Sequence, residues 1–474
     1  MQFAQGIRRL FLGMLACLLL IGLSATYWAI AGRGSLLLRD DNPRLIEAIA
    51  DIQRGAIYDR GGQLLAETTA SEASLRRRYL RPSTYSVVGY YSLRYGAGAA
   101  EAAFDELLSG SNAVITLRDY VERQLLKLPQ VGADIRLTVD ANIQDALAAA
   151  MGDASGAIVV LNAQSGAIQA LLSQPGFDPN ALDEDWQELV EAASQPFFNR
   201  ALQGHYQLGG AMYMLLLAQA LRSDADVTMR FPKADAPVSF KDGMTITCVI
   251  KPEQSELSLI DAYIYGCPAA FQAHWLAEPR QDLAAILAPF AFDAPVTLAG
   301  FPQPEPIDLP AAAEALDEET LMLRALHGQG DVTTTPLHTA AIMAAIATDG
   351  KAVAPAILSA TRPPDAAQWR PLTTETSAPP ILSADVAREL RGILRRAWSI
   401  LGDGPAGDVG ANIVRSQSGD QRQIWLTGFV ANADGAANSF VILLENSDDA
   451  PRLISIGQTL VRALAQHHQG QPAS

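Results

Sequence analysis

The chain has 474 residues, of which 49% are hydrophobic and 18% charged, and its net charge is −16 at pH 7. This length suits two or three domains with a large core, and the composition is that of a globular protein. The negative charge argues against nucleic-acid binding, because no basic patch compensates it. Three cysteines give no disulfide framework. Cys248 and Cys267 are the only pair outside the N-terminal apolar run, and the sequence does not decide whether they are bonded.

An apolar segment near the N-terminus predicts a membrane anchor. Residues 10–32 contain no charged residue and are long enough for one membrane-spanning helix. Arg8 and Arg9 precede it, which predicts a cytoplasmic N-terminus. A cleaved signal peptide is the alternative, because residues 29–31 read Ala-Ile-Ala. We favour the anchor, since the apolar run exceeds the apolar region of a usual signal peptide. In both cases the bulk of the chain is expected outside the cytoplasm.

The residues after this segment predict a small domain. Residues 57–58 read as a short strand, residues 59–62 as a tight turn, and a second strand runs through Leu64 and Leu65. A tyrosine-rich stretch follows over residues 85–95. We expect these tyrosines to pack against a helix from Ala99 to Leu108.

The second half of the chain alternates strands and helices without a strict βα repeat. This texture predicts an α+β domain with an antiparallel sheet. Asp140 or Asn142 is expected to cap the first helix of this region. The main expected elements are strands at Ala157–Leu161, Ala167–Leu172, 423–431 and 438–446, a helix that begins near Thr335 and ends at Gly350, and a final helix at Ile456–His467.

One apolar helix has an unusual beginning. The stretch "GHYQLGGAMYMLLLAQAL" places Gly209 and Gly210 where the helix starts. Helix starts usually carry a capping side-chain oxygen, because the first amide groups lack partners. Residues 200–221 contain no serine, threonine, cysteine or lysine. The helix is therefore predicted to be buried, with no reactive group at its N-terminus.

Six segments in this order resemble class B penicillin-binding proteins, over roughly residues 42–460. The segments are "RGAIYDRGGQLLAET", "LTVDANIQDAL", "GAIVVLNAQSGAIQALLSQPGFDPN", "NRAL", "HGQGDVTTTPLHTAAIMAAIATDGK" and "IWLTGF". The resemblance implies an α+β fold of the transpeptidase and serine β-lactamase type, with helices on both faces of a five-stranded, mainly antiparallel sheet. It implies a tail and anchor at 1–34, an N-terminal pedestal of the dimerisation type at 35–130, and a transpeptidase-like domain at 131–474.

That family carries three catalytic motifs, S-x-x-K, S-x-N and K-T-G. Its serine attacks a D-Ala–D-Ala carbonyl or a β-lactam, and the lysine or a neighbour takes the proton. A family segment of the form Y-x-P-G-S-x-F-K matches residues 206–213 without a gap. The match places Gly210 at the serine position and Tyr213 at the lysine position. The resemblance therefore implies that the catalytic pair is replaced.

The other two motifs are also replaced at the matching positions. These positions hold Gly266, Cys267 and Pro268 for S-x-N, and Arg415, Ser416, Gln417 and Ser418 for K-T-G and the residue after it. Cys267 would need a base such as His274 to act as a nucleophile, and we favour a structural role for it. Arg415, Ser416 and Ser418 are candidates for residual ligand binding, since Arg415 and Ser416 could dock a carboxylate. The alternative, which we weight equally, is that Arg415 is an exposed arginine on a strand edge and binds no ligand.

These observations predict a catalytically inactive pseudo-transpeptidase. We expect a scaffold or regulator of peptidoglycan synthesis or cell division, with proteins of those processes as partners. One alternative is a sensor that binds the peptidoglycan stem peptide. Another is an active D,D-transpeptidase with a relocated nucleophile. The six histidines show no metal-ligand spacing, so we expect no metal and no cofactor. Residues 328–330 and 335–336 match scaffold positions behind the family's cleft.

Overall fold

The computed structural model describes most of the chain. The described residues are 2–30, 51–70, 75–111, 129–241, 243–277, 282–292, 294, 296–304, 318–330, 332–372, 380–401, 408–418, 421–431 and 435–469. The predicted boundary at 34/35 and the last two residues of the predicted anchor lie outside them. The boundary at 130/131 stays a prediction.

The chain divides into two compact units. They are Met1–Gln53 with Thr69–Arg76 and Ile115–Val131, and Arg54–Thr68 with Arg77–Val114 and Gly132–Ser474. The first unit contains α1 (Gln2–Ile30), which covers most of the predicted anchor. Within the described ranges, none of the helices is both long and apolar enough to span a membrane. The predicted anchor at residues 10–32 is therefore not confirmed.

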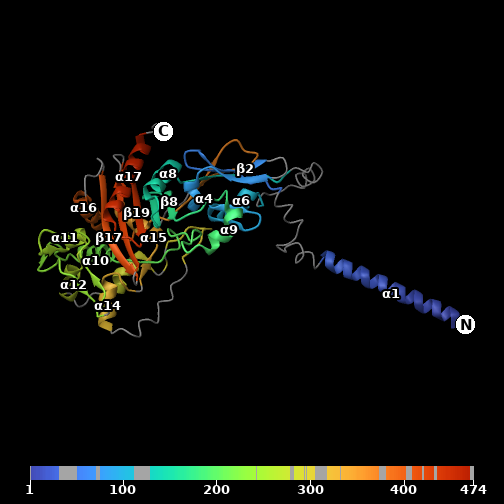
Figure 1. The fold of residues 1–474 in the computed structure, drawn as a ribbon, viewed down its shortest axis with the longest axis horizontal. Helices are drawn as coiled ribbons and strands as arrows, with labels where there is room; N and C mark the ends of the chain where they lie inside the picture. The colour runs from blue at the N-terminus through green and yellow to red at the C-terminus, as the bar shows by residue number, and fades with distance from the viewer. Residues whose placement is uncertain are drawn as a thin grey trace. The chain divides into compact units, whose positions relative to one another are not determined.

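A five-stranded sheet forms the centre of the second unit (Figure 1). Its strand order is β17-β18-β19-β7-β8, and all neighbours are antiparallel. The strands are β17 (Asp408–Ser418), β18 (Gln421–Ala431), β19 (Ala437–Glu445), β7 (Gly156–Asn162) and β8 (Ile168–Gln174). The predicted antiparallel sheet of five strands is confirmed.

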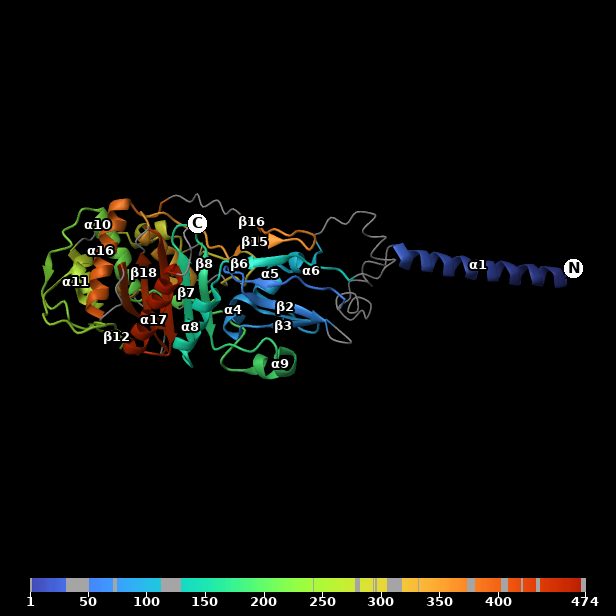
Figure 2. The same cartoon turned by 90° about the horizontal axis from the view of Figure 1, so that it is seen from above.

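Helices cover both faces of this sheet. Successive side chains of a strand point to opposite faces, so the central strands present apolar residues to the helices on each face. Ile158 of β7 packs in one apolar cluster with α8 and α17, which lie side by side (Figure 2). The next residue, Val159, packs in another cluster with α15. These helices are α8 (Ala141–Met151), α15 (Pro336–Ala347) and α17 (Ala450–Gln469). The predicted placement of helices on both faces of the sheet is confirmed.

A mainly helical layer packs against α15 and the β17 edge of the sheet. Its helices are α10 (Ala211–Arg222), α11 (Leu259–Tyr265), α12 (Pro268–Ala277), α13 (Leu283–Leu287), η2 (Ala288–Phe290), α14 (Glu318–Leu326) and α16 (Ala384–Leu401). Three two-stranded ribbons accompany them, β9 (Tyr206–Gln207) with β14 (Thr333–Thr334), β10 (Arg230–Phe231) with β13 (Leu257–Ser258), and β11 (Val238–Ser239) with β12 (Thr245–Ile246). Eight of the twelve residues of α10 are buried here.

A second sheet combines segments from the two halves of the chain. Its strands, in spatial order, are β16 (Arg370–Pro371), β15 (Leu358–Arg362), β6 (Asp134–Leu137), β1 (Ile57–Tyr58), β2 (Leu64–Ala70) and β3 (Leu75–Tyr79). The neighbouring elements are η1 (Pro82–Thr84), α4 (Tyr85–Val88), β4 (Tyr90–Ser92), β5 (Gly96–Gly98), α5 (Ala99–Ala103), α6 (Asp105–Ser109) and α9 (Leu182–Glu191).

Two predicted local features are confirmed. Asp140 caps α8, because its side chain accepts hydrogen bonds from the amides of Asn142 at 2.9 Å and Ile143 at 3.2 Å. The turn after β1 is held by Asp59, whose carboxylate accepts the Gln63 amide at 2.7 Å. Both features are set by neighbours in the chain, which is why the sequence reveals them.

Two other predictions need correction. The expected helix at 99–108 is two short helices, α5 and α6, with a break at Phe104. The rings of Tyr90 and Tyr95 pack against Trp186 of α9. Their partner lies about 90 residues away, so no local pattern pointed to it. The final helix also begins earlier than predicted, at Ala450 and not at Ile456.

Candidate functional site

The predicted nucleophile position lies at the first residue before α10. Gly210 is the N-cap residue and makes no side-chain capping bond. Its amide donates to the Arg415 carbonyl at 2.9 Å. A Cβ atom at this position would lie 3.2 Å from Val414 Cβ, which is a tight contact. The start of α10 therefore packs directly against β17.

The preceding residue requires glycine. Gly209 has φ +51, in the left-handed region that favours glycine. A Cβ atom there would lie 2.1 Å from the Arg415 carbonyl oxygen. The Gly209 amide donates to the Gly328 carbonyl at 2.8 Å. Three segments distant in sequence therefore meet backbone to backbone at the beginning of α10.

Tyr213, at the predicted lysine position, is buried in the first turn of α10. Its hydroxyl forms a 2.9 Å hydrogen bond with His327 Nδ1. Its ring stacks on Phe271 of α12, with centroids 4.6 Å apart and planes 9° apart. The ring thus fills the space between α10, α12 and the loop after α14.

Burial controls the protonation of this pair. Removal from water disfavours the charged form of each group. Burial therefore raises the pKa of Tyr213 above its ordinary value and lowers the pKa of His327 to about 4. Both groups are neutral near pH 7. A neutral phenol is a poor proton acceptor, so Tyr213 does not reproduce the chemistry of a catalytic lysine.

The second motif position forms the turn between α11 and α12. Gly266 ends α11 in the left-handed conformation, and Pro268 begins α12. Between them Cys267 is fully buried and bonded to Cys248, with an S–S distance of 2.06 Å. The sequence did not decide whether these two cysteines are bonded, and the structure shows that they form a disulfide. It takes the Cys267 sulfur out of any role as a free nucleophile, in agreement with the structural role that we favoured.

The third motif position lies on β17, paired with β18 as the counting from Trp425 predicts. Arg415 pairs with Ile424 and Ser416 with Gln423, while Gln417 and Ser418 continue the strand. The Arg415 guanidinium donates to the Cys248 carbonyl at 3.3 Å and pairs with Asp448 at 2.5 Å. The structure therefore brings all three predicted motif positions to one region.

Ser416 does not have the free hydroxyl that a ligand-binding role requires. Its side chain is buried, and its hydroxyl accepts a hydrogen bond from Trp425 Nε1 at 3.0 Å. The same hydroxyl donates to the Gln423 side chain at 3.3 Å. The expected docking of a carboxylate on Ser416 is not consistent with this geometry. Arg415 remains partly exposed, with 34% of its side chain accessible.

Sequence reasoning missed several residues of this region. His327, Phe271 and Asp448 contact the motif positions, and none of them was singled out for that contact. The sequence did offer one signal for His327, because this residue directly precedes the glycine loop at 328–330, which was expected to lie behind the cleft. The scaffold role of that loop and of Thr335 is consistent with the structure, since Thr335 caps α15. Among the described residues, no group of three or more metal-binding side chains occurs.

Two family models match the chain. The penicillin-binding protein transpeptidase domain matches residues 156–463, which is more than half of the chain. The penicillin-binding protein A dimerisation domain matches residues 54–134. The chain therefore belongs to the penicillin-binding protein transpeptidase family.

Relatives of known name agree with this membership. The chain is 30% identical over 382 residues to the peptidoglycan D,D-transpeptidase PbpA of Mycobacterium tuberculosis, covering 76% of each chain. It is 28% identical over 395 residues to PbpA of Mycolicibacterium smegmatis, covering 78% of each chain. The structure of penicillin-binding protein A from M. tuberculosis, as an imipenem acyl-enzyme complex, matches with a TM-score of 0.75 at 26% identity. That match covers 89% of this chain and 100% of the other.

Proposed function

We propose that this protein is a catalytically inactive member of its family that acts as a scaffold or regulator in peptidoglycan synthesis or cell division. The observation that carries the proposal is the start of α10. There Gly210 stands at the matched nucleophile position, and a buried, neutral Tyr213 stands at the matched lysine position. A glycine has no side-chain atom that could be acylated.

The size of the expected loss supports this proposal. Removal of the catalytic serine of a serine hydrolase costs about a million-fold in rate. Here the matched base is also absent, and Pro268 lacks the amide of the S-x-N motif. The three replacements lie in one connected region. A single compensating substitution elsewhere would restore only one of them.

Two alternative functions have less support. A stem-peptide sensor would use Arg415 and Ser416, but Ser416 is buried and Arg415 is paired with Asp448. A relocated nucleophile would need an activated hydroxyl or thiol near the start of α10. The Tyr213 hydroxyl is buried with a raised pKa, and Cys267 is bonded. The geometry favours a structural role for both residues.

The disulfide supports a place outside the cytoplasm. Stable disulfides form in oxidising compartments and are rare in the reducing cytosol. The Cys248–Cys267 bond is consistent with an exported domain. We infer partners among the exported parts of cell-wall synthesis or division proteins.

Intact-mass spectrometry of the full chain with penicillin G tests the proposal. We expect no added mass, while a cooperative thermal transition shows that the protein is folded. Penicillin-binding protein A of M. tuberculosis, for which a penicillin G acyl-enzyme structure exists, is the positive control. A stoichiometric adduct on this chain would overturn the proposal, and peptide mapping would then identify the nucleophile.

A further inference from the structure

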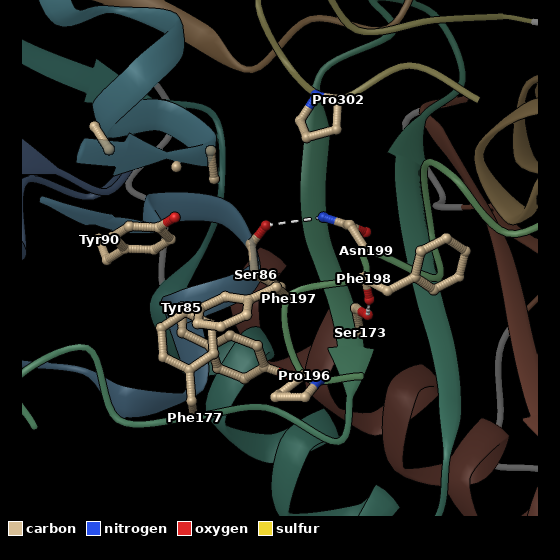
Figure 3. Close-up of a pocket in the computed structure, with 14 residues that line it drawn as sticks. Tyr85, Ser86, Tyr90, Ser173, Phe177, Pro196, Phe197, Phe198, Asn199 and Pro302 are labelled. Atoms are coloured by element: carbon tan, nitrogen blue, oxygen red, sulfur yellow. Dashed lines mark hydrogen bonds between the residues drawn. The ribbon is translucent and has the colours of Figure 1, made fainter. Parts of the chain in front are cut away.

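A pocket lies away from the three motif positions, beside the small domain. Its volume is about 240 Å³. It is lined by Tyr85, Ser86, Gly89, Tyr90, Ala97, Gly98, Ala99, Ser173, Phe177, Pro196, Phe197, Phe198, Asn199 and Pro302 (Figure 3). Sites for whole small molecules usually measure about 300 to 1,000 Å³. This pocket is therefore of a size to receive one large side chain.

The rings at this pocket form a continuous aromatic cluster. Figure 3 shows Tyr85, Phe177 and Phe197 grouped together, with Tyr90 beside them. The centroid of Phe177 lies 5.5 Å from that of Tyr85 and 4.9 Å from that of Phe197. Tyr90 lies 5.7 Å from Phe197. These rings hold one another in place, so the pocket is preformed. Tyr90, Phe177 and Phe197 remain partly exposed and offer ring surface to a ligand.

Three polar side chains of the pocket are already engaged within the protein, whereas the buried Tyr85 hydroxyl has no hydrogen-bond partner among the described residues. The Ser86 hydroxyl donates to the Leu171 carbonyl at 2.7 Å. The Ser173 hydroxyl donates to the Phe198 carbonyl at 3.1 Å. The Asn199 amide donates to the Ser86 carbonyl at 3.1 Å. A sugar unit would require several free hydrogen-bond partners, and the Tyr85 hydroxyl is a single buried group of this kind in the described lining. The lining therefore favours a largely apolar side chain.

An acidic helix, α9, lies beside the aromatic cluster of the pocket. Trp186 of α9 lies 5.1 Å from Phe197 and 6.2 Å from Tyr90, which places α9 beside the aromatic cluster. This helix carries five exposed carboxylates and no basic residue: Asp183, Glu184, Asp185, Glu188 and Glu191. Arg94, over the Tyr95 ring, is a basic group on the same side. The charge of α9 favours a cationic partner.

We propose that this pocket binds an aromatic side chain of a partner protein, presented on a segment that carries lysine or arginine on both sides. The ring packs against the exposed surfaces of Tyr90, Phe177 and Phe197, and the basic residues contact the carboxylates of α9. An apolar anchor in a preformed pocket with charged residues beside it is the usual arrangement of an interaction hot spot. This proposal rests on the proposed scaffold role, which requires a partner protein. Its test does not depend on whether the protein reacts with penicillin.

Calorimetric titration of the full chain with designed heptapeptides tests this proposal. The probe has a central tryptophan flanked by lysines, and matched peptides carry alanine for tryptophan or glutamate for lysine. We expect the tryptophan peptide to bind about tenfold or more tighter than the alanine peptide. Its affinity should fall several-fold between about 0.05 and about 0.5 M salt, because screening weakens the attraction to α9. The glutamate peptide should not bind.

Three variants locate the binding on the protein. Ala97→Leu places a larger side chain into the pocket and should weaken binding about tenfold. The matched control Ala102→Leu changes an exposed residue of α5 outside the lining and should leave binding unchanged. The double variant Glu184→Gln/Glu188→Gln, which neutralises two of the five carboxylates of α9, should reduce the salt dependence.

Three results would overturn the proposal. One is that the tryptophan and alanine peptides bind equally, or that neither binds at millimolar concentration. Another is that a folded Ala97→Leu variant binds as tightly as the wild type. The third is that a peptidoglycan disaccharide occupies the pocket in place of the peptide. A penicillin adduct would contradict the proposed inactivity and leave these binding results unaffected.

Discussion

Tyr213 is the residue on which the proposed loss of catalysis depends most. It lies at the matched lysine position, where it forms a hydrogen bond with His327 and a ring stack with Phe271. An aromatic ring in this position contributes to the apolar core, which a lysine side chain could not do without a partner for its charge. In the proposed match, Tyr213 therefore exchanges a reactive group for packing between α10 and α12.

A two-residue variant tests whether the site accepts its family residues. Gly210→Ser together with Tyr213→Lys restores the motif letters. We expect no penicillin adduct, because a Cβ atom at position 210 meets Val414 at 3.2 Å and the new ammonium group is buried without a carboxylate. The uncompensated charge should lower the free energy of unfolding by about 3 kcal/mol or more. Intact mass and urea unfolding measure the two effects.

The single variant Gly210→Ala is the control for the first of these changes. It introduces the Cβ atom alone, so its loss of stability reports the contact with Val414. An adduct at position 210 in the double variant would show that restoring these two side chains is enough for acylation by penicillin. The residues at the other two motif positions would then have little effect on acylation.

The turn between α11 and α12 is the element that connects the motif positions. The disulfide joins it to Cys248, and the Cys248 carbonyl accepts a hydrogen bond from Arg415 of β17. We match this turn to the S-x-N motif of the family. In this protein the turn carries a disulfide that connects the segment around Cys248 to the helical layer.

Removal of this disulfide should destabilise the fold. The bond closes a loop over a sequence separation of 19 residues, and loops of that size are stabilised by about 3 kcal/mol. The variant Cys248→Ala/Cys267→Ala should therefore have a lower melting temperature than the wild type. Dithiothreitol should lower the melting temperature of the wild type and leave that of the variant unchanged. Equal sensitivity of both proteins would contradict a structural role for the bond.

At the scale of the whole molecule, two buried histidines link stability to pH. Burial lowers the pKa of His327 and of His338 to about 4 each. The His338 ring accepts the Val296 amide at Nδ1, at 2.9 Å, and Nε2 donates to the Phe290 carbonyl at 2.9 Å. The neutral tautomer satisfies both bonds. Protonation of Nδ1 would break the first of them.

Stability should therefore decrease at acidic pH. The unfolded chain takes up these protons near pH 6.5, whereas the folded protein takes them up only near pH 4. The contribution of both residues is complete above about pH 6.5 and is lost as the pH falls to about 4. His327→Gln should reduce the slope of unfolding free energy against pH by up to about 1.4 kcal/mol per pH unit.

Urea unfolding at several pH values between these limits measures this slope. The exposed His205 provides the control, and His205→Gln should leave the slope unchanged. If His327→Gln leaves the slope unchanged as well, the imidazole is accessible to protons in the folded protein.

The sequence by itself determined the local features of this protein. The strand pairs, the Asp140 cap and the helix that begins at Gly210 follow from side-chain periodicity and from capping and turn residues, which act over a few positions. The order of the family segments then defined the sheet and the positions that we match to the three catalytic motifs. Each of these signals depends on neighbours in the chain.

Only the tertiary structure decided how distant residues combine. The contact of Tyr213 with His327, the burial of Ser416 under Trp425 and the aromatic pocket at Phe197 join segments that the sequence does not relate. The expected tyrosine packing on residues 99–108 was incomplete for the same reason, because Trp186 supplies a further partner ring. Packing of complementary shapes selects such pairs, and this selection occurs only when the whole core closes.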